Sequence, residues 1–114
     1  IQRIYQEIMN VHLRNGSYKS VKVTHKDNCE SVCELVTEKC NLPPGFGKYF
    51  ELYEKVKDNE RRLGGKDNLF EVKKQWPMIF GPSGNETHLK CYFIAALKPG
   101  APEKVQQVYK AILK

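Results

Sequence analysis

The segment V-H-L-R-N-G-S-Y-K-S-V-K-V, residues 11–23, decides how this chain folds. Apolar residues alternate with polar ones on both sides of Asn15-Gly16, which is the period of a strand with one buried face. Asn-Gly is a strong hairpin signal, because both residues tolerate the positive φ that a tight turn needs. We therefore predict two antiparallel strands, residues 9–13 and 20–24, joined by this turn.

A helix is predicted directly after the hairpin, from a cap at Asp27 or Asn28 to about Cys40. Its apolar residues recur at helical spacing and form one stripe: Cys29, Val32, Cys33, Val36 and Cys40. The outer side of the same helix carries three acids: Glu30, Glu34 and Glu38. Pro43-Pro44-Gly45 ends the pattern, because proline cannot continue a helix.

The remaining chain alternates strand and helix signals. Strands are predicted over 49–56, 61–63 and 88–97, with the last one apolar enough to be central, and a short helix over 68–76 ends at Pro77. This order, ββαββαβ, is that of ubiquitin, so we predict an α+β fold: a ubiquitin-like β-grasp roll with extra terminal helices. The predicted parts are a leading helical segment at 1–8, the roll at 9–98 and an amphipathic helix within 99–114.

Length and composition limit the alternatives. The chain has 114 residues, and 19 Lys and Arg against 13 Asp and Glu give a net charge of +6. This length suits one domain with one core, and 40% hydrophobic residues are too many for a disordered tail. No apolar run approaches the roughly 18 residues of a membrane helix. Because the sequence opens at Ile1 rather than Met, we expect it to be part of a larger multidomain protein.

The residues that carry most enzyme chemistry are scattered. Three of the cysteines lie on one predicted helix, where neighbours rarely reach disulfide geometry, and no pair has C-x-x-C spacing. We therefore predict buried free thiols at Cys29, Cys33, Cys40 and Cys91. Free thiols are typical of the cytoplasm. The histidines are isolated and no nucleophile motif is present, so we expect no catalysis, no cofactor and no metal. Acids interrupt the basic residues after position 27, so we expect no nucleic-acid partner.

Four stretches of the sequence together resemble a Ras-associating domain. They are the hairpin, C-E-L-V-T-E-K at 33–39, Y-F-E-L-Y-E at 49–54 and E-R-R-L-G-G-K-D-N-L-F-E-V-K-K-Q-W at 60–76. The resemblance covers roughly residues 8–97, and the last stretch is the most specific. The same pattern is also similar to the first, ubiquitin-like lobe of FERM domains.

The Ras-associating resemblance implies a module that binds a GTP-loaded small GTPase of the Ras or Rap type. In that family the second strand pairs with an acidic strand of the GTPase. The second strand of a ubiquitin roll lies at a sheet edge, and a basic edge suits an extended acidic segment. The predicted GTPase-binding residues are the bases of the hairpin and one on the helix: Arg14, Lys19, Lys22, Lys26 and Lys39.

Two alternatives remain open at this point. The glutamates on the helix would repel an acidic strand if they faced it, which favours a degenerate ubiquitin-like domain with a scaffolding role. The FERM resemblance implies contact with acidic membrane lipids, for which the candidate residues are Lys19, Lys22, Lys55, Lys57, Arg61 and Arg62. We expect a cytoplasmic protein that is recruited to the inner face of the plasma membrane. The final helix either packs on the roll or begins a further helical lobe.

Overall fold

The computed structural model describes residues 5–76 and 91–112. Within these ranges five strands form one mixed sheet in the order β2-β1-β5-β3-β4. The central strands β1 and β5 are parallel, and the other neighbours are antiparallel. The elements are β1 (Gln6–Leu13), β2 (Tyr18–Thr24), α1 (Cys29–Lys39), a 3₁₀ turn η1 (Phe46–Tyr49), β3 (Phe50–Val56), β4 (Asn59–Arg62), α2 (Leu69–Lys74), β5 (Cys91–Leu97) and α5 (Glu103–Ile112). The predicted α+β, ubiquitin-like roll is confirmed.

The hairpin turn differs from the expected one. Of Asn15 and Gly16, only Gly16 has a positive φ, at 88°. The Leu13 N–H donates to Ser17 O over 2.8 Å, and the Gly16 N–H donates to Leu13 O over 3.1 Å. These bonds enclose a three-residue loop, 14–16, in which only the last residue needs the left-handed conformation.

The first strand begins earlier than the sequence pattern indicated. The leading helical segment is a wrong prediction for Gln6, Glu7 and Ile8, because these residues pair with Thr24, Val23 and Lys22 in β1–β2. The side chain of Ile8 is 68% exposed, so the apolar spacing at this end of the chain does not reflect a buried helix stripe. Residues 1–4 of that segment lie outside the described residues, as do 88–90 of the last predicted strand.

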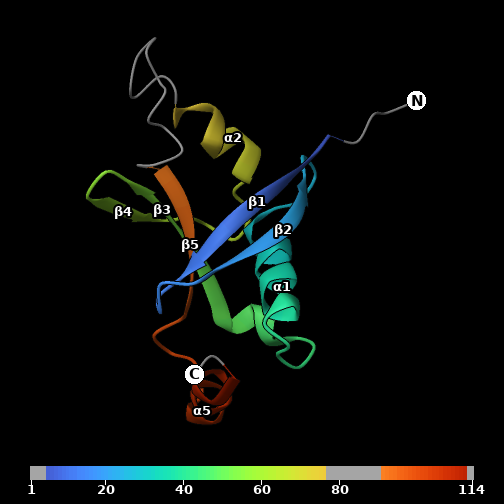
Figure 1. Cartoon of the computed structure of the whole chain (residues 1–114), viewed down its shortest axis with the longest axis vertical. Coiled ribbons are helices and arrows are strands. Elements are labelled where there is room, and N and C mark those ends of the chain that lie inside the picture. Colours follow the sequence, from blue (N-terminus) through green and yellow to red (C-terminus); the bar gives the residue numbers. More distant parts are fainter. Residues whose placement is uncertain (1–4, 77–90, 113–114) are drawn as a thin grey trace.

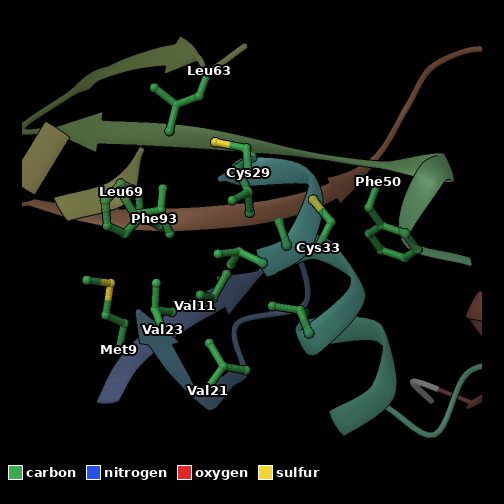
Figure 2. Packing of buried hydrophobic residues seen from close by; sticks show 14 of the residues in the cluster. Met9, Val11, Val21, Val23, Cys29, Cys33, Phe50, Leu63, Leu69 and Phe93 are labelled. Atoms are coloured by element: carbon green, nitrogen blue, oxygen red, sulfur yellow. The ribbon is translucent and has the colours of Figure 1, made fainter. Parts of the chain in front are cut away.

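Helix α1 packs across one face of the sheet and closes the core (Figure 1). Asn28 caps it: its Oδ1 accepts from the Ser31 N–H over 3.0 Å, and the Ser31 Oγ accepts from the Asn28 N–H over 2.9 Å. Figure 2 shows buried side chains of α1, including those of Cys29 and Cys33, among the apolar residues of the sheet. All four cysteines are buried and free, as predicted. Burial raises the pKa of the Cys29 thiol to about 12, so it is unreactive at neutral pH.

Helices α2 and α5 lie at opposite ends of the sheet (Figure 1). Asn68 caps α2, and its Oδ1 accepts the Phe70 N–H over 2.9 Å. On α5, Val105 is buried and the ring of Tyr109 lies 5.2 Å from that of Phe50. The final helix therefore packs on the roll, which was one of the two predicted arrangements. No helix in the described part of the chain is long and apolar enough to cross a membrane.

Candidate functional site

Strand β2 forms one edge of the sheet. Its hydrogen bonds with β1 determine which of its N–H and C=O groups point outward. The Leu13 N–H bonds Ser17 O, and the His25 N–H bonds Tyr5 O. Antiparallel pairs alternate between bonded and non-bonded positions, so the odd-numbered residues of β2 bond β1. The N–H and C=O groups of Tyr18, Ser20 and Lys22 therefore point to the open edge. In the described ranges no strand pairs with that side.

The side chains of β2 divide between the two faces of the sheet. Val21 and Val23 are buried beneath α1, so Lys19, which has the same parity, lies on the α1 side. Lys19 is half-buried and close enough to Cys40 for its charge to lower the pKa of that thiol, although burial raises this pKa by more. Lys22 is exposed and alternates to the outer face. The strand thus offers one base on each side of its open edge.

The flank of α1 beside β2 completes this surface. Ser31, Leu35 and Lys39 follow one another at helical spacing, and Leu35 packs partly buried against the core. A hollow of about 430 Å³ lies between strand and helix. Its lining comes from both elements and from the second residue after α1: Val21, Lys22, Leu35, Glu38, Lys39 and Asn41. We call the open side of β2 together with this hollow the β2–α1 surface. It combines the outward-facing backbone groups of β2, a small apolar floor and lysines.

Two of the three helix acids lie away from the β2–α1 surface. A Cβ added to Gly47 would lie 2.5 Å from Glu34 Oε1, and one added to Gly65 would lie 2.7 Å from Glu30 Oε1. Glu30 and Glu34 therefore rest on the opposite flank of α1. There they line a separate cleft of about 490 Å³ beside β3. Of the acids expected to repel a partner strand, only Glu38 borders the β2–α1 surface.

Arg14 lies apart from the other predicted contacts. Its Nη1 forms an ion pair of 2.7 Å with Glu60 Oε1 on β4, and its guanidinium lies 5.1 Å from the ring centre of Tyr53. The hydrogen bond with Glu60 raises the pKa of Arg14 and lowers that of Glu60. The sequence correctly places Arg14 away from the core, but the structure directs it to the opposite edge of the sheet from β2. Lys26 follows β2, where its N–H donates to Thr24 Oγ1 over 3.3 Å.

The residues predicted to contact lipids do not form one surface. Lys19 and Lys22 are on β2, whereas the other four belong to the β3–β4 hairpin at the opposite edge: Lys55, Lys57, Arg61 and Arg62. Arg61 Nη2 pairs with Glu54 Oε1 over 2.9 Å, and Arg62 Nη1 lies 3.5 Å from Glu51 Oε2. Both glutamates are buried, although strand alternation alone predicts Glu51 to be on the polar face.

Sequence reasoning missed Leu35 and Tyr18. Leu35 lies outside the main apolar stripe of α1. It is four residues from both Ser31 and Lys39, so these three residues share one side of the helix, the flank next to β2. Tyr18 is the first residue of β2 and is 55% exposed on the outer face. Once the loop at 14–16 is known, the alternation of side chains along β2 places Tyr18 on the outer face, and this signal could have identified it. Among the described residues no group of His, Cys, Asp or Glu is arranged to hold a metal ion.

Comparison with protein families shows that the model of the RA like domain matches residues 6–98. A comparison with curated proteins finds no significant match. The Rasip1 RA domain is similar in structure, with a TM-score of 0.59, 15% identity, and coverage of 93% of this chain and 98% of that one. A Lamellipodin structure containing coiled-coil, RA and PH domains has a TM-score of 0.63 and 14% identity over 96% of this chain and 46% of that one.

A FERM-containing structure is also similar. The human Myosin 7b C-terminal MyTH4-FERM domain, in complex with the harmonin-a PDZ3 domain, has a TM-score of 0.53 and 15% identity. The match covers 83% of this chain and 20% of that one. At these identities the structural likenesses show a shared fold, and the resemblance to both groups noted in the sequence is confirmed.

Proposed function

Since the chain belongs to the family of RA-like domains, we propose that it is a non-catalytic module that binds a GTP-loaded small GTPase of the Ras or Rap type. The observation that carries this proposal is the open edge of β2, with the backbone groups of Tyr18, Ser20 and Lys22 directed outward. An extended strand of the partner would add to the sheet there, and main-chain hydrogen bonds would supply affinity.

Charge on the β2–α1 surface supports an acidic partner strand. Lys19 and Lys39 lie on the α1 side of the edge, and Lys22 lies on the outer side. Lys26 follows at the end of the strand. Each exposed ion pair contributes only about 0–1 kcal/mol, so several must act together. Their combined field would mainly accelerate association and select the partner. Arg14 is excluded from this set because Glu60 holds it at the other edge.

The placement of two of the three acids on α1 weakens the main objection to this function. An acidic row facing β2 would favour a domain that has lost GTPase binding. Glu30 and Glu34 instead rest against Gly65 and Gly47, on the other flank. A lipid-binding role gains less support, because its candidate bases are divided between two edges and two of them are paired with buried glutamates.

The cellular setting follows from the same proposal. Four buried thiols that remain free suit a reducing cytoplasm. We place the module there as one domain of a larger signalling protein. Its GTPase partner would recruit it to the inner face of the plasma membrane.

Calorimetry with a charge-reversal variant tests the proposal. Lys22→Glu should weaken binding to GTP-analogue-loaded Ras or Rap by about tenfold or more, since it replaces an attraction at the edge with a repulsion. Lys104→Glu on the exposed side of α5 makes the same change in net charge and is the control. Equal affinities for wild type and Lys22→Glu, or equal affinities for the GTP and GDP forms, would contradict the proposal.

A further inference from the structure

The β2–α1 surface is basic except for one residue. Lys22 and Lys39 line its hollow, and Lys19 lies nearby on the same side of the strand as α1. Glu38 lines the same hollow and is exposed to solvent. The other two acids of the helix are on the far flank. Glu38 is therefore the one acid of α1 that a partner seated on β2 would meet.

Glu38 would oppose a partner that is uniformly acidic. At an exposed site a like charge costs affinity, and an opposite charge recovers it by a similar amount. We infer that Glu38 is a specificity-determining residue, which selects partners whose docking segment carries a basic residue next to its acidic strand. This inference rests on the proposed function, because it assumes that the partner occupies the β2–α1 surface.

The neighbours of Glu38 indicate how such a base would be held. Leu35 is partly buried and lies beside Glu38 in the lining of the hollow. A lysine or arginine can lay its aliphatic stem on an apolar side chain while its charged end reaches a carboxylate. Leu35 and Glu38 together provide these two contacts. Lys39, one residue further along, would repel a base and attract an acid, so the order of charges in the partner segment matters as well as their sum.

Two helix variants separate this local effect from net charge. Glu38→Lys and Glu34→Lys make the same change of charge on α1, but Glu34 lies on the far flank and only Glu38 borders the hollow. Affinities are measured by calorimetry against GTP-analogue-loaded Ras- and Rap-type GTPases. Each GTPase is used in two forms that differ only in the residue flanking the acidic strand, which is lysine in one and glutamate in the other.

Glu38→Lys is expected to weaken binding of the lysine form of the partner by about three- to tenfold, and the glutamate form of that partner is expected to restore it. Glu34→Lys should change either affinity by less than about twofold. Equal effects of the two helix variants would overturn the inference, as would tighter binding of Glu38→Lys to every partner. If the natural chain binds none of the GTPases, or if Lys22→Glu binds as well as wild type, the proposed function itself has failed.

Discussion

Arg14 on the β1–β2 loop and Glu60 on β4 are joined across the outer face of the sheet by an ion pair of 2.7 Å. The loop is next to one edge strand, and β4 is the opposite edge strand. A base that the sequence groups with the lysines of β2 is thus held away from them. This ion pair therefore leaves the lysines of the hairpin, and not Arg14, to contact a partner on β2.

The first prediction concerns Arg14. Arg14→Ala should leave the affinity for a GTP-loaded GTPase within about twofold of wild type, because the side chain does not reach the β2–α1 surface. Lys22→Ala should weaken binding more than Arg14→Ala does. Titration of both variants at the same ionic strength checks the order. A larger loss for Arg14→Ala would place the binding surface on the outer face of the sheet.

A proline on β2 tests the role of the outward backbone groups. The Ser20 N–H faces the open edge, so Ser20→Pro removes a donor that only a partner would use and leaves the ladder to β1 intact. Ser20 Oγ also bonds Asn10 Oδ1 over 2.6 Å, so Ser20→Ala is the matched control. Ser20→Pro should bind about tenfold more weakly than Ser20→Ala while melting at a similar temperature. Equal binding of the two would contradict strand addition.

The core contains one polar contact whose loss should destabilise the fold. Trp76 Nε1 donates to the buried Glu54 Oε2 over 2.6 Å. Trp76→Phe keeps most of the ring packing but removes the donor, so the free energy of unfolding should fall by about 1–3 kcal/mol. Urea denaturation measures it. In a Glu54→Met background the same change should cost less, and an equal cost there would show that packing alone is responsible.

His12 predicts a pH dependence of stability. Its ring lies between those of Tyr18 and Tyr92, with centroids 5.7 and 4.4 Å away, and burial lowers its pKa below the ordinary value of 6.5. Between the lowered pKa and 6.5 the unfolded chain binds more protons than the folded one. The contribution of His12 to stability is therefore complete above 6.5 and is lost as the pH falls through the folded pKa.

Urea unfolding at about pH 7.5 and about pH 5.5 measures this effect. Wild type should lose more stability on acidification than His12→Gln, because glutamine removes the titrating group and keeps a polar side chain. Parallel losses in the two proteins would assign the pH dependence to other groups.

Local patterns predicted most of the fold. Alternation, the helix cap at Asp27 or Asn28 and the apolar stripe of α1 depend on neighbours in sequence; the structure shows the stripe and places the cap at Asn28. Failures occurred where distant residues decide the structure. Burial of Glu51 and Glu54 depends on Arg62, Arg61 and Trp76, which strand periodicity does not include.

The candidate site also has one part that the sequence predicts and one part that distant residues determine. That β2 is an edge strand follows from the order of elements, and the structure confirms it. The direction of each charged side chain depends on tertiary contacts. Glu60 determines where Arg14 lies, and Gly47 and Gly65 leave room for Glu34 and Glu30 on the far flank of α1. None of these three partners is close in sequence to the residue that it positions.

Hydrogen–deuterium exchange at single residues tests the central claim most directly. The amides of Tyr18, Ser20 and Lys22 face the open edge, so they should exchange quickly in the free domain. Addition of a GTP-analogue-loaded Ras- or Rap-type GTPase should slow exchange at these three amides, while the Lys19 and Val21 amides, which already bond β1, change little. Unchanged exchange at all three in a complex that calorimetry shows to be saturated would contradict binding at the β2 edge.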